Sequence, residues 1–163
     1  MKILILDNSI AVTGAFLSAM AMAEELRDAE ASFVLPTKSR VISAAESEGY
    51  RVLTVPFREL GRSVRRVLLY LPFLVANAVR LRLWLARGQV DVVIANDYYN
   101  LLPAAVRLLG WRGRTVTIVR LLPSKQHPLL NRVWILAMRL SSDRIVAVSH
   151  AVHRELPPTV KSS

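Results

Sequence analysis

The side chains best suited to chemistry stand directly after apolar runs of the sequence. Asp97 lies in the polar stretch that follows Val90–Ala95, and Arg120 ends the run 114–119. A carboxylate in such a place can act as a general base, and an arginine can clamp a phosphate or a carboxylate with two hydrogen bonds. Each residue also has a structural alternative: Asp97 caps the next helix, and Arg120 pairs with Asp97 or Asp7.

Other polar and small residues follow apolar runs in the same way. We take them, together with Asp97 and Arg120, as candidate substrate-binding residues. They are Asn8, Thr13, Gly14, Asn96, Tyr98, Ser149 and His150. Gly14 also has a structural alternative, because a glycine lets a helix pack closely on a strand.

Several cofactor and metal signatures are missing from the sequence. The Thr13-Gly14 loop lacks the further glycines of the G-x-G-x-x-G fingerprint, and no G-x-x-x-x-G-K-[ST] phosphate loop occurs. His150 and His153 would share one helix face, but only Glu155 adds a carboxylate at a matching spacing. We therefore predict neither a nicotinamide or flavin cofactor nor a metal site.

The elements that must position these residues alternate along the chain. Unbroken apolar runs such as Ile3–Leu6 indicate strands covered on both faces, and segments with helical spacing separate them. The class is therefore α/β: one Rossmann-like domain over 1–158 with a doubly wound, mainly parallel sheet of about six strands. Residues 159–163 are predicted to be a tail or the start of a linker. Parallel strands end at one rim, where Asp7, Asp97 and Arg120 should converge.

Composition and charge restrict the partners. The chain is 53% hydrophobic, but no uncharged apolar stretch approaches the ~20 residues that span a bilayer. No secretory signal or cysteine occurs, and we expect a cytoplasmic protein. The net charge of +10 calls for an anionic partner such as nucleic acid, a membrane surface or a phosphorylated substrate. Nucleic acid ranks low, because the strands lack the aromatic residues of a single-strand platform.

The helical stretch 58–87 carries seven arginines against one acid. Arginines that share a helix side with aromatic residues are typical of a helix lying on anionic headgroups. The predicted membrane-contact residues are Arg62, Arg65, Arg66, Phe73, Arg80 and Trp84. The alternative is a helix that packs its apolar side on the sheet and keeps its arginines in water. Pro72 is expected to kink this helix or to start a second one.

Four segments of the sequence together carry a family resemblance: MKILILDN, VDVVIANDYY, TVTIVRLLP and DRIVAVSHAVHREL. In this order they resemble the N-terminal domain of GT-B glycosyltransferases of the glycosyltransferase 4 family. The resemblance implies an acceptor-binding domain whose enzyme also needs a second, donor-binding domain with an E-x7-E element, which these 163 residues lack. It also places Thr13-Gly14 near the donor phosphates. Arg120 stands where the family often has a histidine.

By this resemblance the chain is half of an enzyme that transfers a sugar from a nucleotide-sugar donor without a metal or other cofactor. The expected partners are a sugar acceptor, with lipid-linked acceptors among the candidates, an anionic membrane surface, and a donor-binding domain in cis or in trans. The protein would lie at the cytoplasmic membrane and serve polysaccharide or glycolipid synthesis. One alternative is a non-catalytic membrane-docking or scaffold subunit that recruits a donor-binding partner. Another, a free-standing nucleotide-binding protein, is disfavoured by the missing glycine fingerprint.

Overall fold

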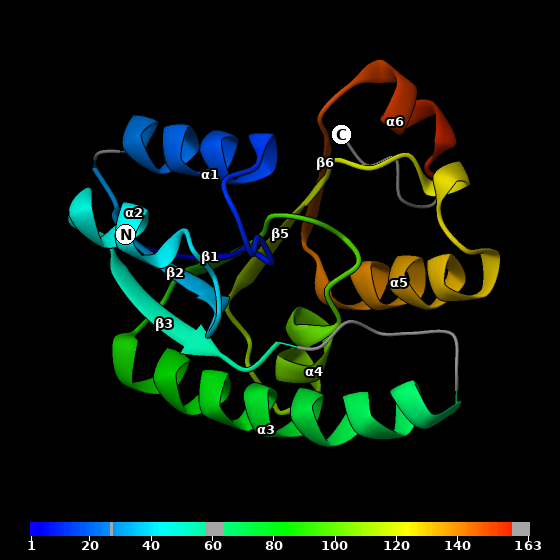
Figure 1. Cartoon of the computed structure of the whole chain (residues 1–163), viewed down its shortest axis with the longest axis horizontal. Helices are drawn as coiled ribbons and strands as arrows, with labels where there is room; N and C mark the ends of the chain where they lie inside the picture. The colour runs from blue at the N-terminus through cyan, green and yellow to red at the C-terminus, as the bar shows by residue number, and fades with distance from the viewer. Residues whose placement is uncertain (27, 58–63, 158–163) are drawn as a thin grey trace.

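Six strands form one open, entirely parallel sheet (Figure 1). The computed structural model describes residues 1–26, 28–57 and 64–157, with the backbone alone over 64–69. The strands are β1 (Lys2–Leu6), β2 (Glu30–Pro36), β3 (Arg51–Val55), β4 (Val92–Ala95), β5 (Arg114–Val119) and β6 (Arg144–Ala147). Their order in the sheet is β3-β2-β1-β4-β5-β6, which confirms the predicted doubly wound, Rossmann-like α/β fold.

Helices cover both faces of the sheet (Figure 1). They are α1 (Gly14–Glu25), α2 (Ile42–Ser47), α3 (Val64–Gly88), α4 (Leu102–Leu108), α5 (Pro128–Ser141) and α6 (His150–Glu155), with a short 3-10 turn at Pro123–Lys125. Side chains alternate along a strand, so Ile3 and Ile5 pack with α1 and α2, whereas Leu4 and Leu6 pack with α3 and α4. This two-sided burial is why the first strand reads as an unbroken apolar run.

The second half of the sheet has a core of its own. Tyr98, Val119, Trp134 and Met138 pack together between β5 and α5, and Val152 of α6 joins them. The ring centroids of Tyr98 and Trp134 lie 6.2 Å apart in an edge-to-face arrangement. The helix α4 contacts both α3 and α5, so α3, α4 and α5 form one helical layer.

The helix α3 differs from its prediction. It runs unbroken from Val64 to Gly88 with Pro72 inside, so the expected second helix does not begin there. Pro72 is exposed, whereas Ala78, Leu81 and Leu85 are buried against the sheet. A proline inside a helix costs about 3 kcal/mol, and we attribute the continuity of α3 to this buried face, which offsets that cost.

Other boundaries shift by a few residues. The first helix ends at Glu25 rather than near Ala29, and the second strand extends from 32–35 to Glu30–Pro36. The predicted domain boundary at residue 158 and the tail 159–163 lie outside the described residues. Within the described part of the chain, no helix combines the length and the apolar character needed to cross a bilayer.

Candidate functional site

Three neighbouring strands end in polar residues that meet at the carboxyl rim of the sheet. Asp7 follows β1, Asn96 and Asp97 follow β4, and Arg120 follows β5. The chain leaves β1 toward β2 and leaves β4 toward β5, so the strand order reverses between β1 and β4. Open α/β sheets bind ligands at such a switch point. The sequence prediction that these termini share one rim is confirmed.

Asn96 is the centre of the polar network at this rim. Its side-chain amide donates to an Asp7 carboxylate oxygen and, at 3.0 Å, to the backbone carbonyl of Ala15. Its amide oxygen accepts from Arg120 Nε at 2.9 Å and from Arg120 Nη2 at 2.7 Å. One buried amide therefore links residues from β1, α1 and β5, and fixes the arginine relative to both carboxylates.

Asp97 is a buried carboxyl group whose pKa is raised. It is 6% exposed, and its Oδ1 accepts from the Tyr98 backbone N–H at 2.8 Å. Burial raises the pKa of Asp97 to about 7, partly opposed by backbone hydrogen bonds from Tyr98 and Arg120 and by the Arg120 charge. The charge of Asp7 raises this pKa further. A carboxyl group with such a pKa can take up or release a proton near neutral pH.

The capping alternative for Asp97 is wrong. The residue before α4 is Leu101, which makes no side-chain cap, and the Leu102 N–H donates instead to Asn100 Oδ1 at 2.9 Å. Asn100 also donates to Asn8 Oδ1 at 3.0 Å and so ties the loop after β4 to the loop after β1. Asp97 is therefore left without a helix-terminal role.

The side chain of Arg120 is half-buried and binds a neutral partner. Both of its hydrogen bonds go to the Asn96 amide oxygen, not to the carboxylates with which the sequence alternative paired it. An amide positions a guanidinium without neutralising it, and a guanidinium has more N–H donors than these two bonds use. Arg120 is thus held in place, and its guanidinium keeps N–H donors that could bind an anion.

The loop after β1 supplies the Thr13-Gly14 part of the site. Thr13 caps α1, because its hydroxyl accepts from the Phe16 N–H at 3.1 Å, as its position in the sequence predicts. A Cβ added to Gly14 would meet nothing within 4 Å, so close helix packing does not explain this glycine. Open space therefore lies above the first turn of α1.

Three of the predicted site residues lie apart from the network. Tyr98 is buried in the core between β5 and α5, and its hydroxyl bonds to Asn131 Oδ1 at 2.9 Å. Ser149 caps α6 through a bond from the Val152 N–H at 3.3 Å. His150, the first residue of α6, is exposed.

Two residues of the network were not among the predicted substrate-binding residues, although Asp7 was expected at the rim. Asp7 and Asn100 both connect the loops after β1 and β4. The signal for Asp7 was available, because it is the first polar residue after a buried strand, as Asn96 is after β4. Asn100 gave no such signal, since its partner Asn8 lies far away in the sequence.

A cavity of about 470 Å³ opens at the same rim, over the ends of β1, β2 and β3. Its walls are mostly apolar, with one cation, and consist of Ile10, Pro36, Thr37, Lys38, Pro56, Phe57 and Phe73. Hydrogen bonds brace these walls: Arg40 N–H donates to Ile10 O at 2.8 Å, and Asn77 Nδ2 to Pro56 O at 3.0 Å. Over the residues that the structure describes, no three His, Cys, Asp or Glu side chains gather as a metal site would require.

A sequence model of Glycosyltransferase Family 4 matches residues 12–159. A comparison with curated protein sequences gives no significant match. Among solved structures, HepE from Anabaena in complex with UDP and glucose is similar, with a TM-score of 0.72 and 21% identity over 96% of this chain and 40% of HepE.

Two other solved structures share the fold. The lipopolysaccharide outer core galactosyltransferase WaaB in its apo form has a TM-score of 0.68 and 13% identity, over 99% of this chain and 43% of WaaB. MurG from Acinetobacter baumannii has a TM-score of 0.63 and 11% identity, over 100% of this chain and 44% of MurG. The chain thus spans about two fifths of the length of these structures.

Proposed function

Because the chain belongs to Glycosyltransferase Family 4, we propose that it is the acceptor-binding part of an enzyme that transfers a sugar from a nucleotide-sugar donor to an acceptor hydroxyl. The observation that carries the proposal is Asp97, a buried carboxyl group with a pKa of about 7 beside Arg120, at the ligand-binding edge of the sheet. The donor is a co-substrate, and the proposal includes no separate cofactor.

Asp97 is the proposed proton acceptor. As the acceptor oxygen bonds to the anomeric carbon of the donor sugar, its proton passes to the Asp97 carboxylate. The bond between that carbon and the phosphate oxygen breaks, and the phosphate leaves with the electron pair. A carboxylate with a pKa of about 7 is a stronger base than an exposed one and is still ionised in half of the molecules at neutral pH.

Arg120 and the start of α1 are proposed to receive the leaving phosphate. Arg120 has unused donors, and its guanidinium bonds to an amide rather than to a carboxylate, which suits an anion that gains charge during the reaction. Gly14 leaves room above the first turn of α1, where N–H groups and the helix dipole favour a phosphate. The remaining contacts would come from a donor-binding domain, in the same chain or in another.

The rim cavity is proposed to hold part of the acceptor. Its apolar walls and the single cation Lys38 suit an apolar group next to an anionic one. The cavity lies over β1 to β3, and Asp97 follows β4, so an acceptor that reaches both crosses roughly two strand spacings, about 10 Å. A lipid-linked sugar acceptor would meet this requirement.

The test is Asp97→Asn in the chain combined with its donor-binding domain, supplied in cis or in trans. UDP-glucose, the donor in a HepE structure, is the first donor to assay. We expect a kcat about 100-fold lower than that of the wild type. The wild-type rate should rise with pH through about 7, because the base must be ionised, and the variant should lose this rise.

Asp91→Asn is the matched control. Asp91 stands just before β4 as Asp97 stands just after it, and Asp91 is exposed at the opposite edge of the sheet. We expect unchanged kcat and an unchanged pH profile for this variant. Full activity of Asp97→Asn with every active donor would remove Asp97 from the site.

The layer formed by α3, α4 and α5 suggests a membrane surface. These helices contain eight arginines and no acid, whereas α1 and α2 contain three glutamates and no lysine or arginine. Exposed apolar side chains line the layer, and we call them the outer stripes: Leu71, Val75, Val79 and Leu83 on α3, with Val133, Leu136 and Leu140 on α5. Exposed arginines such as Arg80 and Arg139 flank them.

We propose that the outer stripes contact anionic lipid. The membrane contact predicted from the sequence for α3 would then extend to α5. Of the predicted contact residues, Arg80 is exposed, whereas Phe73 and Trp84 are half-buried and line cavities. Arg62 and the side chains of Arg65 and Arg66 lie outside the described residues. Apolar side chains beside arginines and without acids would suit the interface of an anionic bilayer.

Co-sedimentation with phosphatidylglycerol vesicles tests the docking surface. Replacing Arg62, Arg65, Arg66 and Arg80 with Gln should weaken binding, by about 1 kcal/mol or 5-fold per charge at low salt. Leu83→Asn should weaken it as well, because the side chain no longer favours the bilayer. Leu17→Asn is the control, since Leu17 is an equally exposed leucine on α1. Equal binding of the wild type to phosphatidylcholine and phosphatidylglycerol would contradict the electrostatic part.

A further inference from the structure

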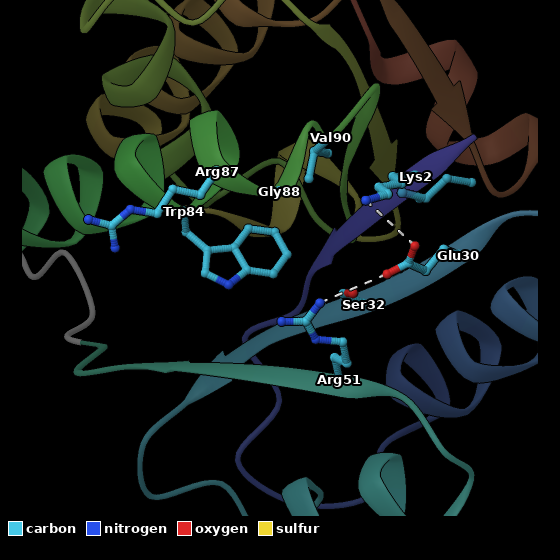
Figure 2. A pocket seen from close by; sticks show the side chains of 9 residues that line it. Lys2, Glu30, Ser32, Arg51, Trp84, Arg87, Gly88 and Val90 are labelled. Carbon is cyan, nitrogen blue, oxygen red and sulfur yellow. Dashed lines mark ion pairs between the residues drawn. The ribbon is translucent and has the colours of Figure 1, made fainter.

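A second cavity, of about 280 Å³, lies at the amino edge of the sheet, opposite the candidate site (Figure 2). The first residues of the strands form one wall: Lys2 of β1, Glu30 and Ser32 of β2, and Arg51 of β3. The last turns of α3 form the other wall, mainly through Trp84. The cavity therefore lies between the sheet and the end of α3, away from Asp97 and Arg120.

Ser32 is the least expected residue of this cavity. It is 5% exposed and faces the α3 layer, on the same side of the sheet as its register partner Leu4. Across the part of the chain that the structure describes, no protein group forms a hydrogen bond with its hydroxyl. The hydroxyl is not among the fully buried polar atoms that lack a partner, so it is open to whatever fills the cavity. Its exposed surface lies in the cavity, so a ligand there could supply the missing partner.

The charges of the cavity are unbalanced. Glu30 is shared between Lys2, at 3.8 Å, and Arg51, at 3.9 Å, which are loose contacts (Figure 2). Arg87 adds a third cation, although its side chain points away from the other lining groups in Figure 2. Among the described lining residues three cations outnumber one acid, and Asp91, whose Oδ2 accepts from the Lys2 backbone N–H at 2.7 Å, lies beside them. Arg51 is the register partner of Ser32 on β3, so both can reach one group held between them.

Trp84 gives the cavity a flat apolar wall. Figure 2 shows its indole ring between α3 and β2, turned toward Ser32 and Arg51. Gly88 in the last turn leaves this ring uncovered, because a Cβ there would lie 3.8 Å from it. Aromatic rings bind other flat groups by stacking or edge contacts. The indole ring of Trp84 thus forms one side of the cavity. The cations Lys2 and Arg51, with the Ser32 hydroxyl, form the other.

We propose that this cavity is a second ligand site, which binds a small phosphate monoester with a flat ring. The phosphate accepts hydrogen bonds from Arg51 and from the Ser32 hydroxyl, and the ring packs on Trp84. Lys2 adds positive charge at the edge. Because Trp84 belongs to α3, the bound ligand also contacts the helix that carries the first outer stripe.

Phenyl phosphate is the probe, since it has an anionic group and a flat ring and little else. Titration of the isotope-labelled chain is followed by NMR at the Trp84 indole N–H and the Ser32 and Arg51 amides. We expect saturable shifts at these three groups, and binding about 10-fold tighter than that of inorganic phosphate or of phenol. Equal affinity for phenyl phosphate and inorganic phosphate would overturn the proposal.

Three variants test the individual contacts. Arg51→Gln should weaken phenyl phosphate binding about 10-fold, because a charge-assisted bond is lost, and Ser32→Ala about 3-fold. Arg114→Gln is the matched control, because Arg114 is also an exposed arginine that begins a strand at this edge but does not line the cavity. Equal effects of the two arginine variants would refute the site. Neither result depends on whether the chain transfers a sugar, since Asp97→Asn should leave the phenyl phosphate titration unchanged.

Discussion

At the carboxyl edge of the sheet the polar side chains that follow β1, β4 and β5 are bonded to one another and largely buried, whereas at the amino edge Glu30 and Arg51 are exposed and loosely paired. Asp7, Asn96 and Arg120 form one network with donor–acceptor distances of hydrogen bonds. At the amino ends of β2 and β3, the strands on one side of β1 in the sheet, the side chains of Glu30 and Arg51 are 51% and 74% exposed and lie 3.9 Å apart. The two edges therefore differ in how strongly polar groups interact.

Burial explains the difference. An exposed ion pair gains little over hydration, so charges at the amino edge can change at small cost. A buried carboxyl group cannot be hydrated, so Asp97 resists ionisation and depends on its neighbours. Burying the Asp97 carboxyl group thus lowers the free energy of unfolding but holds a reactive group in place. Such a loss of stability is common at functional sites. Substitutions at the two edges should separate these effects.

The largest effect is expected for Asp97→Asn, and it depends on pH. The folded-state pKa of about 7 lies above the usual 3.8, so the folded chain binds more protons between these values and wild-type stability falls as pH rises through this range. The Asn variant cannot ionise. Its free energy of unfolding relative to wild type should rise by about 3 kcal/mol between pH 5 and pH 8. Urea unfolding at both pH values measures this, and an equal difference at both would contradict the raised pKa.

Asn96→Leu should be next. The leucine cannot bond to Asp7 or Arg120, and the buried Asp7 carboxylate loses a donor. We expect a loss of about 2 kcal/mol in the free energy of unfolding, because unpaired buried polar groups cost this much. Thermal or urea unfolding at pH 7 measures the loss. A change below about 0.5 kcal/mol would show that the network does not hold the rim together.

Asp143→Asn tests the shortest ion pair at the amino edge among the described residues. Asp143 precedes β6, accepts from the Thr115 N–H at 2.7 Å and lies 2.8 Å from Arg107 Nη2. We expect a loss of about 1 kcal/mol, because the pair is only partly exposed but solvent still screens it. Urea unfolding at low and high salt should show a smaller loss at high salt. A salt-independent loss would assign the effect to the Thr115 hydrogen bond alone.

Glu30→Gln should have the smallest effect. Its contacts with Lys2 and Arg51 are long and exposed, so the free energy of unfolding should change by less than about 0.5 kcal/mol. The same substitution should strengthen phenyl phosphate binding in the amino-edge cavity, since it removes the one acid among the described residues that line it. A stability loss as large as that of Asn96→Leu would abolish the contrast between the edges.

The sequence predicted those parts of the molecule that depend on local pattern. Unbroken apolar runs located the strands, and the convergence of Asp7, Asp97 and Arg120 followed from parallel topology. It could not predict Asn96 as the centre of the network, because that depends on which side chains become neighbours when β1, β4 and β5 pair. For the same reason, the sequence pattern favoured Asp97 as a cap for α4. In the structure Asn100, not Asp97, accepts a hydrogen bond from the first turn of that helix.

Helix α5 shows another limit of sequence patterns. Val133, Leu136 and Leu140 are exposed, whereas Trp134 and Met138 face the core. When a helix has apolar residues on two sides, spacing alone cannot decide which side packs on the sheet. The half-burial of Phe73 and Trp84 on α3 depends on the same kind of tertiary contact.

The strand order has a consequence for how copies of the chain meet. β3 and β6 are the outer strands, and their free backbone edges could add to the sheet of another molecule. Both strands are short, and each begins with an arginine, Arg51 or Arg144. Two molecules approaching edge to edge would bring like charges together, which protects the folded chain from aggregation through its sheet.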